Sequence, residues 1–530
     1  MTPSDRPASA TPAPHNAASE LVDRHLRAGR GGRIAFLDDE GAVSYAQLAE
    51  RVNRAGNALR ALGIEAEQRV LLVLLDTVDF VAAFLGAIKI GAVPVPVNTL
   101  LPAKDYEHLV RDSRARVVLV SDALAAKVEG AIAASPFVRH AVVVRSPRGP
   151  GEAAAAAGRL VRWEDLTGAA SSLCEAAPTT ADDVAFWLYS SGSTGRPKGA
   201  MHLSAHLLRT SELYAQPVLG IVEDDVVYSA AKLFFAYGLG NALTFPLSVG
   251  ACAVLSAERP TPQVVREVMR KHQPTIFGGV PTLFASLLAD ETFGPATSSA
   301  RLRVATSAGE ALPRHVGERW KARFGSDILD GIGSTEMLHI FLSNRPGDVR
   351  YGTSGKPVAG YELELRSDAG GLTSDGEEGS LWVRGPTAAM GYWNDRERSL
   401  ATFHGPWTRT GDRYVRDAEG YYTYAGRADD MLKVGGIWVS PFEVESALVG
   451  HEAVLEAAVV GHEDAGGLIK PKAFVVVKDA ARAGTALEAE LKAFVKGTLA
   501  PYKYPRWIEF VPELPKTATG KIQRFKLRHG

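Results

Sequence analysis

A short loop at residues 189–199 collects the residue types that bind phosphate groups. Its sequence is YSSGSTGRPKG, in which glycines let backbone N–H groups approach an anion and Arg196 and Lys198 add positive charge. The remaining candidate phosphate contacts are Ser190, Ser191, Gly192, Ser193, Thr194 and Gly195. We therefore interpret the segment as an ATP-binding loop. Because its lysine does not have the spacing of a Walker loop, a polar surface linker is the alternative.

A second polar segment, DGIGSTE at residues 330–336, places a carboxylate after a Gly/Ser/Thr turn. Glu336 could bring Mg²⁺ to an ATP phosphate while Thr335 donates a hydrogen bond. An ordinary structural turn is the alternative, because turns of this composition are common.

Three further segments carry charge near the C-terminal end. They are TRTGD at residues 408–412, GRADDMLKVGG at 426–436 and PKTATGKIQR at 515–524. The carboxylate of Asp412 and the guanidinium of Arg427 could hold the two hydroxyls of a ribose, with a surface salt bridge as the alternative. Lys521 is predicted to lie in a flexible loop, where a lysine usually adds only a solvated charge.

The elements around these segments indicate an α/β protein. The first loop follows an apolar run at 184–189 that predicts a buried strand, and a helical pattern begins near Ser204. A loop between a strand and a helix is where α/β proteins bind ligands. Strands and helices are predicted to alternate elsewhere, with a helix at 45–62 capped by Ser44 and Gln47, strands at 69–75, 275–280 and 302–306, and helices at 261–272 and 281–288. We expect mainly parallel sheets covered by helices.

Composition limits the class of protein and its partners. The chain has 530 residues, 46% hydrophobic residues and a net charge of −1, which indicate more than one globular domain and neither nucleic acid nor an anionic membrane as partner. Only two cysteines occur, so a reducing cytoplasm is expected. Lys89, Pro94 and Pro96 interrupt the most apolar early stretch, which predicts a buried helix and an extended segment and no membrane span. Residues 1–16 are predicted to form a disordered tail and not an export signal.

Taken together and in this order, the five charged or glycine-rich segments resemble the adenylate-forming superfamily of acyl-CoA ligases, luciferases and peptide-synthetase adenylation domains. The resemblance covers most of the chain. It implies a large N-terminal domain of βα-layered, mainly parallel sheets at residues 17–428 and a small mobile α+β C-terminal domain at 429–530, with Asp429 at the hinge. A monomer or a homodimer is expected.

The resemblance also implies roles for individual residues. The first loop would cover the β- and γ-phosphates of ATP, Thr335 and Glu336 would contact phosphate and Mg²⁺, and Asp412 and Arg427 would hold the ribose. The adenine site would be lined by Gly309, Glu310, Ala311, Asp330, Gly331 and Ile332. Many relatives have an aromatic residue where Ile332 stands, so an aliphatic contact would replace stacking on adenine here.

The implied reaction has two steps. A carboxylate attacks the α-phosphate of ATP, pyrophosphate leaves, and the acyl-adenylate that forms is then attacked by a thiol. Lys521 would place a positive charge between the two anions of the first step, and the small domain would rotate about Asp429 before the second. Because the chain ends soon after Lys521, without room for a carrier-protein domain, free coenzyme A is expected as the thiol.

The acid is indicated by the segment KLFFAYG at residues 232–238, which looks most like that of benzoate-CoA ligases and their hydroxy- and aminobenzoate-using neighbours. The implied acyl pocket is lined by Tyr228, Phe235, Ala236, Tyr237, Ala308, Gly331, Gly333, Leu338 and His339. Aromatic walls beside small residues suit a flat ring. His339 could hydrogen-bond the ligand or could be a packed core side chain.

The hypothesis from the sequence is ATP-dependent formation of benzoyl-CoA or a close aryl-CoA. A stand-alone adenylation enzyme that loads a separate carrier protein is one alternative. A nucleotide-binding regulatory protein that keeps the fold without turnover is another, which the presence of Lys521 and Glu336 disfavours.

Overall fold

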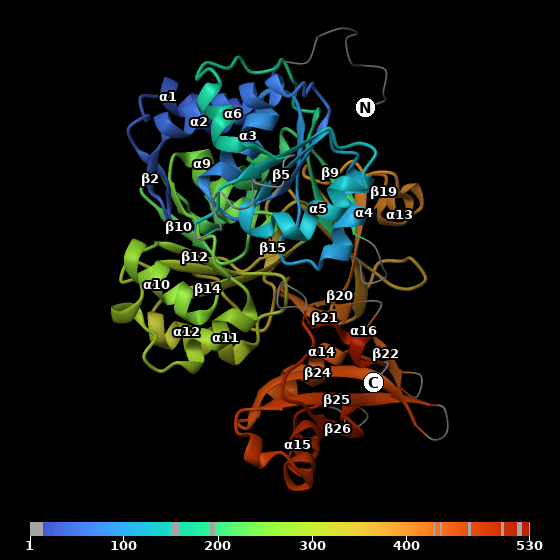
Figure 1. Cartoon of the computed structure of the whole chain (residues 1–530). Coiled ribbons are helices and arrows are strands. Elements are labelled where there is room, and N and C mark those ends of the chain that lie inside the picture. The colour runs from blue at the N-terminus through green and yellow to red at the C-terminus, as the bar shows by residue number, and fades with distance from the viewer. Residues whose placement is uncertain are drawn as a thin grey trace.

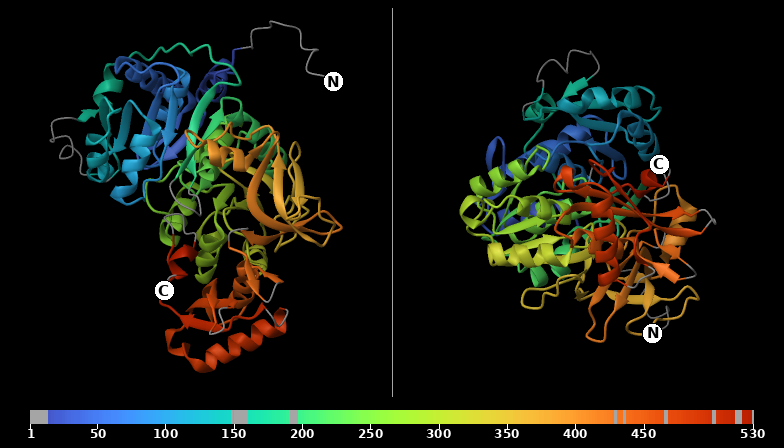
Figure 2. Two further views of the ribbon diagram at one scale, coloured as in Figure 1. Left: turned by 90° about the vertical axis from the view of Figure 1, so that its right-hand side faces the viewer. Right: turned by 90° about the horizontal axis from the view of Figure 1, so that it is seen from below.

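The computed structural model describes residues 14–147, 149, 160–190, 197–427, 430–434, 437–464, 468–499, 503–516 and 522–528. A large body contains the blue to orange part of the chain, and a smaller body contains the red C-terminal part (Figure 1). The small body lies at one end of the molecule, beyond the sheet that contains β20 and β21, and the left view of Figure 2 shows the same separation. This arrangement confirms the predicted α/β fold with a small C-terminal domain.

The first part of the large body is a parallel sheet with the strand order β4-β3-β5-β6-β7. Its strands are short and rich in β-branched apolar residues, as expected for strands covered on both faces. Its strands are β3 (Arg69–Val73), β4 (Val93–Pro96), β5 (Val117–Ser121), β6 (His140–Val144) and β7 (Leu160–Arg162). The strand predicted at 69–75 and the extended segment predicted after Lys89 are both confirmed.

Within the described residues the largest sheet has nine strands, in the order β16-β15-β14-β13-β12-β10-β11-β1-β2. Its middle strands run parallel, and antiparallel strands close both ends. The strands are β1 (Ile34–Asp38), β2 (Gly41–Ser44), β10 (Val226–Ser229), β11 (Cys252–Val254), β12 (Ile276–Gly279), β13 (Val304–Ser307), β14 (Asp327–Gly333), β15 (Ile340–Ser343) and β16 (Lys356–Pro357). Ser307 pairs with Asp330, so β13 and β14 end side by side.

One prediction about the first loop is wrong. The loop does not join a strand to a helix, because β8 (Val184–Ser190) is followed by β9 (Lys198–Leu203), and the two strands form an antiparallel hairpin. The short helix α7 (His206–Thr210) comes only after β9. The sequence pattern predicted a helix near Ser204 and did not predict the strand β9 that precedes it.

A second antiparallel unit completes the large body. In it β17 pairs with β18, β18 with β20, and β20 with both β19 and β21. The strands are β17 (Glu362–Arg366), β18 (Glu378–Arg384), β19 (Phe403–His404), β20 (Trp407–Arg416) and β21 (Tyr422–Arg427). The last strand leads to the small body, so the chain leaves the large body at the end of β21.

The small body is an α+β unit, as predicted. Ser440 caps its first helix by accepting a hydrogen bond from the Glu443 N–H at 3.2 Å. Its elements are β22 (Leu432–Val434), β23 (Ile437–Val439), α14 (Pro441–Val449), β24 (Val454–Glu463), β25 (Ile469–Val477), α15 (Thr485–Thr498), β26 (Trp507–Phe510) and α16 (Arg524–Leu527). The boundary predicted at 428/429 falls on residues outside the described part of the chain.

The helices of the large body cover its sheets. The predicted capping box is present before α2, where the Ser44 and Gln47 side chains each bond the other residue's N–H. The helices are α1 (Arg24–Arg27), α2 (Tyr45–Ala61), α3 (Val78–Lys89), α4 (Ala103–Ser113), α5 (Ala125–Ala133), α6 (Trp163–Ala169), α8 (Ala236–Leu239), α9 (Phe245–Val249), α10 (Pro262–His272), α11 (Pro281–Ala289), α12 (Arg314–Phe324) and α13 (Arg396–Thr402). Short 3₁₀ or π-helical segments span Ser19–Asp23, Asp122–Leu124, Ser211–Leu219, Gly240–Thr244, Pro295–Thr297 and Ala480–Arg482. None of the helices in the described ranges has the length and apolar character needed to cross a membrane.

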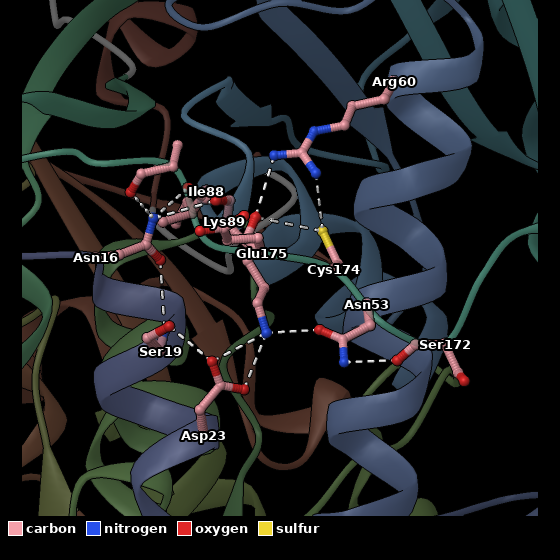
Figure 3. A network of polar contacts seen from close by, with 11 residues as sticks. Asn16, Ser19, Asp23, Asn53, Arg60, Ile88, Lys89, Ser172, Cys174 and Glu175 are labelled. Carbon is pink, nitrogen blue, oxygen red and sulfur yellow. Dashed lines mark hydrogen bonds and ion pairs between the residues drawn. The ribbon is translucent and has the colours of Figure 1, made fainter.

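Residues 14–16 of the predicted N-terminal tail are described, and they contact the large body. Pro14 forms a bridge with Thr180, and Asn16 is buried, with its side-chain amide donating to the carbonyls of Ile88 and Lys89 at 3.2 Å each (Figure 3). The beginning of the described chain is therefore fastened to the end of α3.

A buried ion pair fastens the same region (Figure 3). The Lys89 ammonium, 3% exposed, donates to both oxygens of Asp23 at 2.9 Å and to the Asn53 side chain at 2.5 Å. These contacts join α3 to α2 and to the segment Ser19–Asp23. A buried lysine needs such partners because its charge has lost water.

We expect Lys89→Met to lower the free energy of unfolding by about 3 kcal/mol, because Asp23 and Asn53 would lose their common partner. Denaturant titration followed by tryptophan fluorescence measures the change. The control is Arg314→Met, which breaks the exposed pair Arg314–Glu318 on α12 and should cost less than about 1 kcal/mol. Equal costs for the two variants would contradict the role given to the buried pair.

Candidate functional site

The ends of β13 and β14 bring two predicted adenine segments together. Ala308 to Ala311 follow β13, and Asp330 to Ile332 form the end of β14. The Asp330 Oδ2 accepts a hydrogen bond from the Leu312 N–H at 3.4 Å, which ties the two segments. Gly309 has a φ of +94°, a conformation that favours glycine. The predicted adenine-site residues lie together at the C-terminal ends of these two neighbouring strands: Gly309, Glu310, Ala311, Asp330, Gly331 and Ile332.

Asp330 is a buried carboxylic acid near the end of β14. Burial raises its pKa to about 8, against the opposing effects of Ser307 and the Leu312 N–H. Its Oδ1 has no hydrogen-bond partner among the described residues, and neither has the Ser307 Oγ. A protonated Asp330 can donate a hydrogen bond at neutral pH, because its pKa lies above that range.

Glu336 is joined to the first loop through a tyrosine. The Tyr392 hydroxyl donates to the Glu336 Oε1 at 2.7 Å, and the Lys198 Nζ lies 4.5 Å from the Tyr392 ring centroid and 3.5 Å from its hydroxyl. Burial lowers the pKa of Lys198, while Glu336 opposes that shift. Burial, the charge of Glu336 and the hydrogen bond to Glu336 raise the pKa of Tyr392. The Tyr392 hydroxyl therefore stays protonated and can donate. The Lys198 ammonium and the Glu336 carboxylate, which come from distant segments of the chain, therefore both lie beside the Tyr392 side chain.

A buried histidine makes a second link between the same segments. The His202 Nε2 on β9 donates to the Thr335 carbonyl at 2.7 Å, and its Nδ1 lies 3.2 Å from the Nδ1 of His206. Burial lowers the pKa of His202 to about 4, so the ring is neutral at neutral pH. Only one ring nitrogen of a neutral histidine carries hydrogen, and the carbonyl requires it to be Nε2. The backbone of Thr335 is thereby fixed to β9.

The predicted ribose pair lies on neighbouring strands. Asp412 on β20 faces Arg427 on β21, and their side chains form an ion pair at 3.1 Å. The Arg427 Nη1 also donates to the Thr410 carbonyl at 3.2 Å. Arg427 is close enough to Lys198 to contribute to the lowering of its pKa. The part of the pair in holding a ribose remains a prediction.

The candidate acyl pocket is centred on His339. The ring is 3% exposed and lies among the rings of Phe245, Tyr237 and Tyr214, at centroid distances of 4.4, 5.6 and 5.4 Å. Neither ring nitrogen has a hydrogen-bond partner of acceptable geometry among the described residues. Burial lowers the pKa of His339 to about 3, which proximity to the Tyr237 backbone partly opposes. His339 is therefore a neutral polar side chain surrounded by aromatic rings.

Tyr237 and Leu338 are neighbours of His339, and the positions of the other predicted pocket residues have local causes. The Tyr237 hydroxyl donates to the Thr306 carbonyl at 2.8 Å, which fastens α8 to β13. Leu338 is buried with a φ of +65°, a strained conformation for leucine. Phe235 directly precedes α8, whose first residue is Ala236. Ala308 is buried in the same cluster as Phe245.

Two predicted pocket glycines are needed for sheet pairing. A Cβ at Gly331 would lie 2.7 Å from the Leu342 carbonyl, and one at Gly333 would lie 2.5 Å from the His339 carbonyl. Tyr228 packs on Phe277 in a different hydrophobic cluster from His339 and its neighbours. These three residues have structural reasons for their identity, and their part in a pocket remains a prediction.

Some predicted site residues lie outside the described part of the chain. They are Ser191, Gly192, Ser193, Thr194, Gly195, the hinge residue Asp429 and the catalytic candidate Lys521. The residues that flank them are described. Ser190 and Lys198 pair at the end of the hairpin, and Lys516 forms a bridge with Ile522 beside the C-terminal loop.

Tyr392 and His202 are site residues that the sequence reasoning missed. Tyr392 lies in a stretch without regular alternation, and its bridge with Ala200 comes from tertiary packing. His202 lies four residues after Lys198 on β9, so the two share a face of that strand. If the strand had been predicted, the alternation of side chains along it would have placed His202 on the same face as Lys198.

The residues present fit a magnesium ion that is shared with a nucleotide. Among the described residues there is no group of three or more His, Cys, Asp or Glu side chains that could hold a metal ion. Mg²⁺ commonly binds one or two carboxylates together with substrate phosphates and water. Glu336 supplies one carboxylate beside the phosphate-type loop, which matches that pattern.

Comparison with protein families and proteins of known sequence gives consistent matches. Residues 23–393 match the family described as "AMP-binding enzyme", and residues 443–521 match "AMP-binding enzyme C-terminal domain". The chain is 60% identical over 524 residues to a benzoate–CoA ligase of Thauera aromatica, covering 98% of this chain and 97% of the relative. It is 50% identical to a 4-hydroxybenzoate–CoA/benzoate–CoA ligase of Rhodopseudomonas palustris, covering 97% and 94% of the two chains.

Solved structures give the same result. A benzoate CoA ligase from Burkholderia xenovorans is 53% identical, with a TM-score of 0.88 and coverage of 97% of this chain and 99% of that one. An anthranilate CoA ligase in complex with anthranoyl-AMP is 43% identical, with a TM-score of 0.90 and coverage of 100% and 98%.

We expect Tyr392→Phe to slow acid-dependent ATP–pyrophosphate exchange by about tenfold, because hydrogen bonds to charged groups contribute about 1.5–3 kcal/mol. The variant removes the bond to Glu336 and keeps the ring beside Lys198.

The matched control for this variant is Tyr351→Phe, which removes a hydroxyl that donates to the Asp327 carboxylate at 3.0 Å outside the site. The control should leave exchange within about twofold of wild type. Unchanged exchange in Tyr392→Phe would contradict the role given to the tyrosine.

Proposed function

This chain belongs to the AMP-binding enzyme family, and on that premise we propose that it is an ATP-dependent ligase that joins benzoate, or a close substituted benzoate, to coenzyme A. The reaction passes through an acyl-adenylate and releases pyrophosphate and AMP. Substrates of this reaction are the aromatic acid, ATP and coenzyme A. The likeness to benzoate–CoA and 4-hydroxybenzoate–CoA/benzoate–CoA ligases supports the choice of acid.

The observation that carries the proposal is that charged and aromatic groups flank the turn after β14. Tyr392 bonds Glu336 and lies beside Lys198, and His339, three residues after Glu336, lies among the rings of Tyr214, Tyr237 and Phe245. The charged part suits a nucleotide triphosphate, and the aromatic part suits a flat acid. Adenylation requires the two ligands to lie next to each other.

In the proposed adenylation step, the residues of this chain mainly position and neutralise. Lys198 is poorly solvated, so a nearby phosphate favours its charged form. Glu336 would hold Mg²⁺, which when bound withdraws negative charge from the phosphates. Asp412 and Arg427 would exchange part of their mutual contact for the ribose hydroxyls. Lys521 would neutralise the carboxylate and the α-phosphate as they approach.

The proposed acid site holds the ring by area and shape. The Tyr237 ring stacks on the His339 ring at 5.6 Å, and the Phe245 ring meets the His339 ring edge to face at 4.4 Å. The low pKa of His339 keeps its ring uncharged, so it can hydrogen-bond a neutral ring substituent without attracting a second anion. A location in the cytoplasm and a monomeric or homodimeric state remain predictions from the sequence.

We expect thioester formation with benzoate and coenzyme A, and a weaker signal with ring-substituted benzoates. Chromatography of the acyl-CoA product and a pyrophosphate-release assay measure the two half-reactions separately. Adenylate without benzoyl-CoA would favour the enzyme that loads a carrier protein. Absence of acid-dependent exchange with every aromatic acid would favour the regulatory protein and overturn the ligase.

Two variants should separate the half-reactions. Lys521→Gln should reduce adenylation by at least about a hundredfold, because the like charges of the reactants would lose their neutralising cation. Asp429→Pro should slow thioester formation while adenylation stays within about threefold of wild type, because a hinge must absorb backbone rotation. Single-turnover assays with isolated acyl-adenylate measure the second step alone. Equal loss of both steps in Asp429→Pro would contradict the hinge.

A further inference from the structure

A second buried lysine–aspartate pair lies beside the candidate acyl segment. Asp76 stands between β3 and α3, and Lys232 follows β10, so the pair joins two different sheets. The Lys232 Nζ is 3.8 Å from the Asp76 Oδ2, and Asp76 is 6% exposed. The same ammonium donates to the carbonyls of Ser256 and Glu258 at 2.5 and 2.7 Å. Its oxygen partners come from two segments far apart in the chain, Asp76 and the stretch 256–258.

The carboxylate also holds the main chain of the acyl segment. Both oxygens of Asp76 accept from the Leu233 N–H, each at 3.3 Å. Burial raises the pKa of Asp76, and Lys232 and the Leu233 N–H oppose that shift. A buried N–H without an acceptor is costly, so the position of Leu233 follows that of Asp76.

The position of Lys232 and Leu233 determines the position of the pocket residues after them. The Phe235 N–H donates to the Lys232 carbonyl at 3.0 Å, which closes a tight turn. A Cβ at Gly238 would lie 2.0 Å from that carbonyl, so the backbone returns directly over Lys232. Phe235, Ala236 and Tyr237 lie inside this turn, and a shift of its base moves all three.

We propose that Asp76 and Lys232 form a clamp, here called the acyl clamp, whose residues position the aromatic wall of the acid site and thereby set which substituted ring is accepted. The inference rests on the proposed function, because it assigns the segment 232–238 to the acid site. Neither residue touches the reacting atoms, so both are positioning residues. A difference of one atom's room in an apolar pocket changes selectivity by about tenfold or more, so a small displacement is sufficient.

The ion pair in Figure 3 is a matched control for a purely structural role. Lys89 is also a buried lysine bonded to an aspartate, and it ends α3 whereas Asp76 precedes that helix. The helix separates the two pairs by about 18 Å. No residue of the Lys89 network lies in the segment 232–238.

The experiment compares Lys232→Met, Asp76→Ala, Asp76→Asn and Lys89→Met with the wild type. Acid-dependent ATP–pyrophosphate exchange is measured with benzoate, 2-aminobenzoate and 4-hydroxybenzoate, and thermal midpoints report folding. We expect Lys232→Met and Asp76→Ala to raise KM for benzoate by about tenfold and to change the ratio of kcat/KM between acids by at least about threefold. KM for ATP should stay within about twofold.

Asp76→Asn keeps an acceptor for the Leu233 N–H, so it should retain most of the wild-type selectivity and a folded state. Lys89→Met should lower the thermal midpoint and leave the ratio between acids unchanged. The acyl clamp is overturned if folded Lys232→Met or folded Asp76→Ala keeps the wild-type ratio, as Lys89→Met is expected to do. Failure of the wild type to use any aromatic acid would instead overturn the function on which the clamp rests.

Discussion

The contact between β9 and the turn after β14 holds together the groups on which the site depends. His202 bonds the Thr335 carbonyl, and Tyr392 joins Glu336 to the side of Lys198. A carboxylate and a cation placed this close would otherwise form a direct pair and leave neither for a ligand. The tyrosine hydroxyl satisfies one carboxylate oxygen while the ring occupies one side of the ammonium, so the charges are positioned without cancelling each other.

Buried charge serves a related purpose elsewhere in the large body. Two lysine–aspartate pairs stand at the ends of α3, and each joins segments that are distant in the chain. A buried pair contributes little net stability, because desolvation costs offset the attraction between the charges. Its value lies in geometry, since an alternative packing would leave the charge without partners. The Lys89 pair fastens the N-terminal segment, and the Lys232 pair fastens the segment that precedes Tyr237.

The elements that sequence reasoning predicted correctly are those with local causes. Ser44 and Gln47 cap α2 through each other's N–H groups, and the Thr261 side chain caps α10 by accepting from the Val264 N–H. The strand β9 was missed because its neighbours, not its own pattern, determine its conformation. β9 pairs with β8 along one edge and, through Ala200, forms a bridge with Tyr392 along the other, so its backbone partners come from tertiary structure.

By itself, the sequence determined which chemical groups are available and in which order: a glycine and hydroxyl loop with a lysine, a carboxylate after a turn, an acid and an arginine on later strands, and aromatic residues before them. Tertiary structure alone decided their partners. The bonds from Tyr392 to Glu336, from His202 to Thr335 and from Asp76 to Leu233 join residues that are 56 to 157 positions apart. Such contacts depend on how sheets and hairpin pack, because no local propensity links residues at that separation.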